Sequence, residues 1–169
     1  DLMKVAKILK GKTIHPDVSL VLAPGSKQVL SMIAENGALK DIVDSGARIL
    51  ESGCGPCIGM GQAPASNAVS LRTFNRNFYG RCGTVSASVY LVSPEVAAAS
   101  AITGVLTDPR TLNDDIHVEM PEKFVVHDNM ILEPAVAGTE VEVVRGPNIK
   151  PFPLNKALTT DLSGEVLLK

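Results

Sequence analysis

Val18-Ser19-Leu20-Val21-Leu22-Ala23-Pro24-Gly25-Ser26 is the stretch that decides the fold. Its apolar part, Val18 to Ala23, is broken by one Ser and bounded by Pro16 and by Pro24-Gly25. Such a run is typical of a strand that is buried in a parallel sheet. Ser26 is a suitable N-cap for a following helix, because its hydroxyl can accept a hydrogen bond from a free backbone N–H. A buried strand that leads directly into a helix predicts an α/β protein.

The sequence on both sides of this stretch predicts further helices and strands. A helix with apolar residues at helical spacing precedes it and ends at Gly11, and the helix after Ser26 ends at Asn36-Gly37. We expect a helix over 38–44, strands over 47–51, 69–74 and 87–92, and a helix over 95–104 capped by Ser93-Pro94. We therefore predict a three-layer α/β/α domain with a mostly parallel sheet over residues 1–108.

Prolines divide the sequence after Asp108, at positions 109, 121, 134, 147, 151 and 153. Short strands are expected over Lys123–Val126 and Glu140–Val144, followed by a proline-fixed stretch over Arg145–Pro153. We interpret residues 109–169 as covering strands and an extended strand-and-proline linker that leads out of the domain.

Composition limits the partners of the chain. Its 169 residues suffice for one good core. The net charge of −2, with 4% aromatic residues and no Trp, argues against a nucleic acid or an anionic membrane as partner. No apolar run approaches the roughly 20 residues that span a bilayer. Three cysteines, an odd number, favour a reducing cytoplasm. The chain begins on Asp1 without an initiator Met, and we expect both ends to be cuts in a longer protein.

Gly53-Cys54-Gly55-Pro56-Cys57-Ile58-Gly59 is the first stretch that carries chemistry. Its Cys-Gly-Pro-Cys spacing is that of a thioredoxin redox motif, but the glycine-rich exit is a poor helix start and no Trp precedes Cys54. A structural zinc would need four ligands, and the sequence lacks a second cysteine pair or a close His pair. Two cysteines in one turn can also hold part of an iron–sulfur cluster, with further thiolates from elsewhere.

Phe74-Asn75-Arg76-Asn77-Phe78-Tyr79-Gly80-Arg81 is the second such stretch. Surface ion pairing would explain the arginines, but Arg76 and Arg81 in a polar loop at a strand end also suit bidentate binding of a carboxylate. Asn75 would add a neutral donor beside them. Cys82 is interpreted as a small hydrophobic residue. The three histidines lack ligand spacing and are interpreted as structural or solvated.

These two stretches, in this order and followed by Val92-Ser93-Pro94-Glu95, closely resemble the third domain of the aconitase family. The resemblance covers essentially the whole chain. It implies a dehydratase–hydratase that moves a hydroxyl group between adjacent carbons of a di- or tricarboxylate by means of a [4Fe-4S] cluster. By the same resemblance, Cys54 and Cys57 are two of three cluster cysteines. Asn75, Arg76 and Arg81 correspond to residues near the substrate carboxylates.

Other parts of the family's active site are absent from the chain. The resemblance places the first cluster cysteine upstream of Asp1, and the serine base in a swivelling domain beyond Lys169. We therefore expect a third-domain piece plus a linker, whose partners are a small tricarboxylate substrate and the remaining domains of the parent chain. Alone, the piece is expected to bind no intact cluster and to show no turnover.

Three functional hypotheses follow. The stretches Arg145–Pro153 and Gly164–Lys169 look like the linker of a single-chain aconitate hydratase, which is our first choice. The segment Thr107–Arg110 also resembles the two-subunit isopropylmalate and homoaconitate dehydratases. Some aconitases bind RNA once the cluster is lost, so an RNA-binding apo form is a hypothesis of another class, against which the charge of −2 counts.

Overall fold

The computed structural model describes residues 1–112, 116–124 and 126–166. Its backbone divides into two compact units, of which the first is Asp1–Asn129 and the second begins at Met130. The domain boundary that the sequence suggests near residue 108 stays a prediction.

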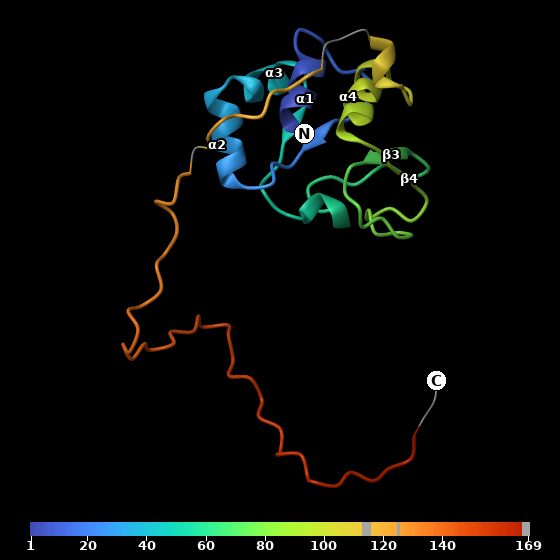
Figure 1. The fold of residues 1–169 in the computed structure, drawn as a ribbon. Coiled ribbons are helices and arrows are strands. Elements are labelled where there is room, and N and C mark those ends of the chain that lie inside the picture. Colours follow the sequence, from blue (N-terminus) through green and yellow to red (C-terminus); the bar gives the residue numbers. More distant parts are fainter. Residues whose placement is uncertain (113–115, 125, 167–169) are drawn as a thin grey trace. The chain divides into compact units, whose positions relative to one another are not determined.

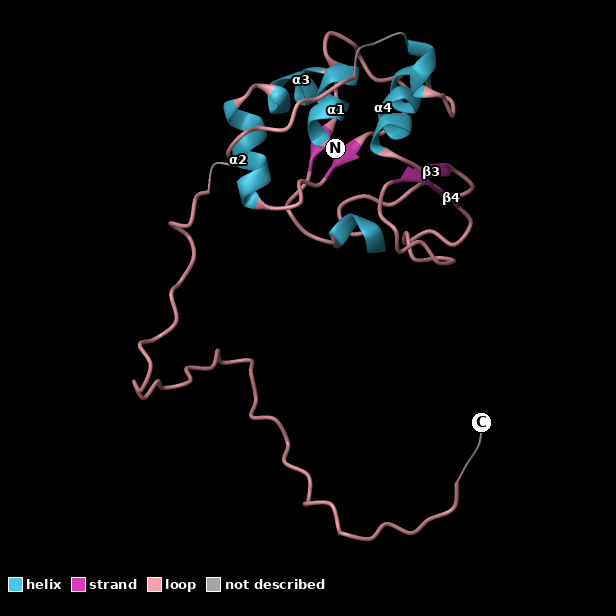
Figure 2. Cartoon of the chain, in the orientation of Figure 1, coloured by secondary structure: helices cyan, strands magenta, loops and turns pink. Residues whose placement is uncertain are grey.

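The first unit contains helices and short strands that alternate along the chain (Figures 1 and 2). In order they are α1 (Leu2–Leu9), β1 (Val21–Leu22), α2 (Lys27–Glu35), α3 (Ala38–Asp44), β2 (Arg48–Ile49), the 3₁₀ helix η1 (Gly55–Ile58), β3 (Val69–Arg72), β4 (Ser88–Leu91), α4 (Pro94–Thr103) and the 3₁₀ helix η2 (Pro109–Leu112). The predicted α/β class and the predicted order of elements are confirmed. No helix in the described ranges could cross a lipid bilayer.

The strands are parallel, as predicted, but they form two pairs and not one sheet. β1 pairs with β2, and β3 pairs with β4. β1 and β3 share no hydrogen-bond ladder, and residues of both strands line a cleft of about 1380 Å³. Each strand is also shorter than the range predicted for it, because the ladder covers two residues in the first pair and four in the second.

The helix boundaries follow the capping signals of the sequence. The Ser26 hydroxyl accepts a hydrogen bond from Val29 N at 3.1 Å, and the Ser93 hydroxyl accepts one from Val96 N at 3.2 Å. Both hydroxyls thus satisfy a backbone donor that the first helical turn leaves unpaired. Gly104, at φ +80°, closes α4 in the left-handed conformation that glycine adopts without strain.

The core of the first unit is formed around α1, which packs against both α3 and α4 (Figure 1). Its inner face buries Ile8 and Leu9 completely, and α3 contributes the fully buried Ile42. α3 leads into β2 and α4 follows β4. Through these two helices, α1 connects the β1–β2 pair with the β3–β4 pair.

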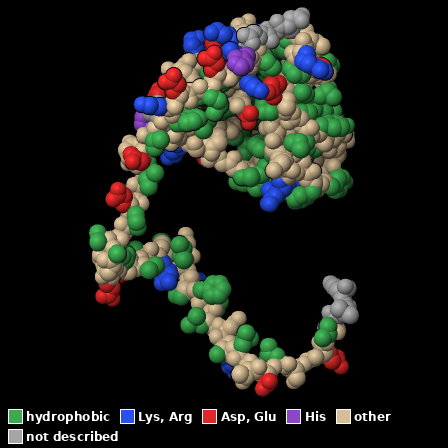
Figure 3. Space-filling model, viewed as in Figure 1, with side chains coloured by type: hydrophobic (Ala, Val, Ile, Leu, Met, Phe, Trp, Pro, Cys, Tyr) green, Lys and Arg blue, Asp and Glu red, His purple; other side chains and the backbone are tan. Residues whose placement is uncertain are grey.

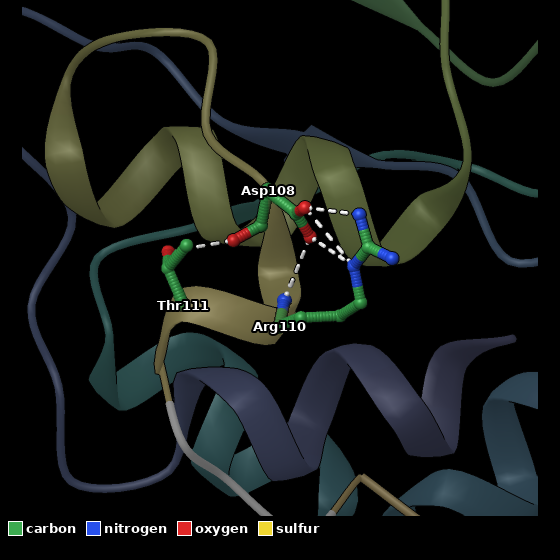
Figure 4. A network of polar contacts seen from close by, with 3 residues as sticks. All are labelled: Asp108, Arg110 and Thr111. Atoms are coloured by element: carbon green, nitrogen blue, oxygen red, sulfur yellow. Dashed lines mark hydrogen bonds and ion pairs between the residues drawn. The ribbon is translucent and has the colours of Figure 1, made fainter.

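A small polar network surrounds the start of η2 (Figure 4). Arg110 Nε donates to both carboxylate oxygens of Asp108, at 2.9 and 3.0 Å, and the Arg110 backbone N–H donates to the same carboxylate at 3.0 Å. Thr111 Oγ1 donates to the Asp108 carbonyl at 2.7 Å. The bonds from Arg110 lower the pKa of Asp108 to about 2. Asp108 therefore stays ionised and fixes the chain where it leaves α4.

The strands predicted after residue 108 are wrong where the structure describes them. Glu140–Val144 forms no strand, and neither do Lys123, Phe124 and Val126; position 125 lies outside the described residues. The alternating valines of Glu140–Val144, Val141 and Val143, are exposed by 60% and 69%. Alternation alone does not make a strand, because a strand needs a ladder partner and a face to bury. Figure 3 shows apolar side chains exposed along the second unit.

Candidate functional site

The cysteine turn, which we define as Gly53–Gly59, is built around the single-turn helix η1. Cys57 N–H donates to the Cys54 carbonyl at 3.3 Å, and Gly59 N–H donates to the Pro56 carbonyl at 3.2 Å. Pro56 stands in the first turn of η1, where its missing N–H costs no helical bond. Cys54 is exposed, whereas Cys57 is only 2% exposed. The turn therefore presents one accessible and one buried thiol.

The two thiols influence each other's ionisation. A hydrogen bond with Cys54 holds the pKa of Cys57 below its ordinary value, and the Arg81 guanidinium adds to this effect against the opposing effect of burial. The same hydrogen bond raises the pKa of Cys54. While protonated, the Cys57 thiol also donates to the Cys54 carbonyl at 2.7 Å. Cys57 is therefore the thiol that is predisposed to the thiolate form, which is the form that binds a soft metal.

Arg81 links the arginine loop, which we define as Phe74–Arg81, to the cysteine turn. Its Nη2 donates to Cys57 Sγ at 3.6 Å, and its guanidinium lies 5.2 Å from the centre of the Phe78 ring. Its buried Nε has no hydrogen-bond partner within the described residues. Arg76 is exposed, and its positive charge acts on Cys54, whose pKa it lowers slightly against the stronger effect of Cys57. Asn75 is exposed as well.

Gly59 brings the backbone of the cysteine turn against the segment that follows Arg81. A Cβ atom on Gly59 would lie 2.6 Å from the Cys82 carbonyl oxygen and 3.0 Å from Gly83 Cα. Such a close approach is possible only without a side chain, and Gly59 also has a φ of +84°. Cys82 itself is buried, as interpreted, and its thiol donates to the Thr84 carbonyl at 3.2 Å.

Two depressions border the cysteine turn. A pocket of about 260 Å³ is lined by Ala23–Gly25, Ser52–Cys54 and Phe74, so a ligand there would meet the Cys54 thiol. The larger cleft of about 1380 Å³ reaches Pro56 and Phe74, but no cysteine lines it. Because Cys54 lines the smaller pocket and no cysteine lines the larger cleft, we place the candidate site at the smaller pocket.

The part of the chain that the structure describes contains no group of three or more His, Cys, Asp or Glu side chains that could hold a metal ion. The histidines lie elsewhere: Nδ1 of His15 accepts a hydrogen bond from Asp17 N–H at 3.3 Å, and Nε2 of His127 lies 3.4 Å from Glu35 Oε1. Within the described residues, no third side chain of these types joins Cys54 and Cys57 in a metal-binding group.

Arg72 is a site-supporting residue that the sequence analysis missed. It ends β3, is only 6% exposed, and its Nη1 donates to the Pro56 carbonyl at 3.0 Å and to the Cys57 carbonyl at 3.3 Å. The only signal in the sequence was its place two residues after Ser70, since residues i and i+2 of a strand share a face. The sequence pattern would assign the face of Ser70 and Arg72 to solvent, because the apolar residues Val69 and Leu71 lie on the opposite face of the strand.

Comparison with known proteins identifies the family. The model of the aconitase family (aconitate hydratase) matches residues 1–104. Among similar proteins, the homoaconitase large subunit of Thermus thermophilus is 45% identical over 117 residues, or 68% of this chain and 28% of that protein. The 3-isopropylmalate dehydratase large subunit 1 of Thermotoga maritima is 46% identical over 112 residues, or 65% and 27%. The mitochondrial homoaconitase of Candida albicans is 41% identical over 116 residues, or 68% and 17%.

The matched residues contain the cysteine turn, the arginine loop and every helix and strand from α1 to α4. The chain spans little more than a quarter of the length of the large subunits that it resembles. The matched region is nonetheless well over half of the chain itself. The chain therefore belongs to the aconitase family.

Proposed function

We propose that the chain supplies part of the active site of an iron–sulfur hydro-lyase, which moves a hydroxyl group between adjacent carbons of a di- or tricarboxylate. One observation carries the proposal: the guanidinium of Arg81 donates to Cys57 Sγ at 3.6 Å. An arginine suited to a carboxylate and a thiol suited to a soft metal thus meet at one place. Membership of the aconitase family supports this combination.

Cys54 and Cys57 are the residues that would hold a [4Fe-4S] cluster. The donor set fits, because the two thiols lie in one short turn and Arg81 favours the thiolate form of Cys57. When bound, the cluster would supply a Lewis acid for the hydroxyl group and a carboxylate of the substrate. We propose that the third cysteine comes from outside this chain, so the chain alone retains no intact cluster.

Asn75, Arg76 and Arg81 are the proposed substrate-binding residues. Asn75 and Arg76 are exposed donors, and the charge of Arg76 reaches Cys54. Arg81 is half-buried, so its charge is less screened by solvent than that of a surface arginine. Together they would hold substrate carboxylates beside the cysteine turn and orient the carbon that exchanges its hydroxyl group. The other partners would be the remaining domains of the parent chain, among them the swivelling domain.

Two substrate assignments compete. Aconitate hydratase activity, which converts citrate to isocitrate through cis-aconitate, is our first choice because of the linker-like sequence after residue 144. The names of the relatives favour isopropylmalate or homoaconitate as the second. The matches to these large subunits cover only 109 to 117 residues of the 169.

The test uses the complete gene product that carries this chain, reconstituted with iron and sulfide. It is given cis-aconitate, homoaconitate or isopropylmaleate separately, and hydration is followed as the loss of ultraviolet absorbance of the conjugated double bond. We expect hydration of cis-aconitate, and a loss of at least about 100-fold in kcat/KM for Arg81→Gln, because a charged donor to substrate is removed.

Arg48→Gln is the matched control, because Arg48 also donates to a loop carbonyl, that of Gly61 at 2.9 Å, but does not contact either cysteine. Preferred hydration of isopropylmaleate or homoaconitate would select the second assignment. Failure to hydrate all three acids in a cluster-loaded protein would refute the proposed activity.

A further inference from the structure

The buried guanidinium of Arg72 forms a bridge between β3 and the cysteine turn. Its Nη1 donates to the carbonyls of Pro56 and Cys57, and its Nε donates to Ser70 Oγ at 3.1 Å. A buried arginine is costly unless its charge and its donors are well solvated by the protein. The three hydrogen bonds of this guanidinium compensate part of that cost and fix the side chain between β3 and the cysteine turn.

Of the two carbonyls that Arg72 contacts, that of Pro56 also accepts the Gly59 N–H at 3.2 Å, whereas that of Cys57 lies near the end of the short helix. The last carbonyls of any helix lack intrahelical partners, and isolated 3₁₀ turns are weak because of their poor hydrogen-bond geometry. η1 has only four residues, and Cys57 is the third of them. The guanidinium thus holds the carboxyl end of η1 at the residue that carries the buried thiol.

The contact also couples distant parts of the chain. Arg72 follows Cys57 by fifteen residues, and β3 is fixed by its ladder with β4, including the pairing of Arg72 with Leu91. Arg81 follows the same strand in the sequence. It contacts the sulfur of Cys57, whereas Arg72 contacts the carbonyl oxygen. One strand pair therefore anchors both arginines that contact Cys57.

We infer that Arg72 is a positioning residue for the cysteine turn, which holds the backbone of Pro56 and Cys57 so that the two thiols face one ligand. The inference rests on the proposed function only for the identity of that ligand. The geometric part, that Arg72 orders the turn, stands on the hydrogen bonds and burial of this chain.

The test compares Arg72→Met and Arg72→Lys with Arg48→Met in the 169-residue chain. Arg48 is a matched control, because it too donates to a carbonyl of the glycine-rich segment, that of Gly61, and to Gln62 Oε1 at 2.8 Å. Its contacts lie beyond both cysteines. Circular dichroism first establishes which variants keep their helices.

The first readout is amide hydrogen exchange at Cys57 and Gly59, whose N–H groups close η1. Arg72→Met should accelerate it at least about tenfold, because two hydrogen bonds from a charged donor are lost. Arg72→Lys should restore part of the protection, since an ammonium group can still donate to these carbonyls. Arg48→Met should change exchange at these amides less than about twofold. Unchanged exchange in a folded Arg72→Met variant would overturn the inference.

The second readout is the thiolate-to-metal absorbance that appears when Co²⁺ is added to the reduced protein. Arg72→Met should weaken Co²⁺ binding about tenfold and Arg48→Met should not, because only the first variant frees the cysteine backbone. Absence of a thiolate band in the unmodified chain would contradict the proposed metal site, whereas amide exchange would still decide the role of Arg72. A full-strength band in Arg72→Met would count against positioning of the thiols.

Discussion

Replacing Gly59 by alanine tests whether the close approach of the cysteine turn to Cys82 and Gly83 is a real constraint. The substitution has two costs. Forcing an L-residue into the left-handed region at φ +84° costs about 1–2 kcal/mol. The added Cβ would also lie 2.6 Å from the Cys82 carbonyl oxygen, which belongs to the backbone and must move. Overpacking of this kind costs typically about 1–3 kcal/mol.

Gly37→Ala separates the two costs. Gly37 has almost the same φ, +82°, but no atom lies within 4 Å of the position that a Cβ would occupy. We therefore expect Gly37→Ala to lower the free energy of unfolding by about 1–2 kcal/mol and Gly59→Ala by about 2–5 kcal/mol. Urea denaturation of the 169-residue chain, followed by circular dichroism, measures both values.

Local opening provides a second measurement on the same pair. Cys82 is buried beside Gly59, so its alkylation by iodoacetamide should be faster in Gly59→Ala and unchanged in Gly37→Ala. The reasoning is refuted if the two variants lose equal stability and Cys82 is equally protected in both.

Three further predictions concern the core, the helix caps and the network at η2. Ile42→Ala removes a fully buried side chain and should lower the free energy of unfolding, measured by urea denaturation, by about 2–5 kcal/mol. Val43→Ala, at a half-exposed neighbour, should lower it by less than about 1 kcal/mol. Similar losses in the two variants would contradict the described core. Ser26→Ala should cost about 1 kcal/mol because α2 loses its side-chain cap, and an unchanged denaturation midpoint would argue against that bond. The depressed pKa of Asp108 means that its stabilising contribution is present above pH 3.8 and is lost as the pH falls toward 2. A carboxyl NMR titration should therefore show a midpoint near 2 that returns toward 3.8 in Arg110→Met, and an unshifted midpoint in the unmodified chain would refute the network.

The helices were predictable because their ends carry local chemical signals. Ser26 and Ser93 each bond the backbone N–H three residues later, and Gly104 adopts the left-handed conformation that ends α4. Such signals depend on neighbours in the sequence and need no knowledge of the tertiary structure.

The strands and the tail were less predictable because a strand depends on its partner. The apolar run Val18–Ala23 indicated a strand correctly, but only Val21–Leu22 has a ladder with β2. The stretch Glu140–Val144, which was also predicted to be a strand, has no ladder at all. Pattern alone identifies residues that could pair, and the partner decides which of them do.

The residues proposed for the candidate site could be named from the sequence, but the contacts between them could not. Cys54, Cys57 and Arg81 were marked by spacing and residue type, and the structure brings all three together. Arg72 was not, because its Nη1 donates to backbone carbonyls fifteen and sixteen positions earlier. A hydrogen bond from a side chain to a distant backbone carbonyl does not depend on the type of the residue that accepts it, so no sequence motif indicates it.

The measurement that most directly tests the account is the visible absorption spectrum of the complete gene product after anaerobic reconstitution with iron and sulfide. Cys82→Ala is the internal control, because Cys82 is a buried thiol that donates to Thr84 and is not assigned to the cluster. We predict that Cys54→Ser and Cys57→Ser each lose the broad iron–sulfur band while Cys82→Ala retains it. A band of full intensity in both serine variants would contradict the assignment of Cys54 and Cys57 as cluster ligands.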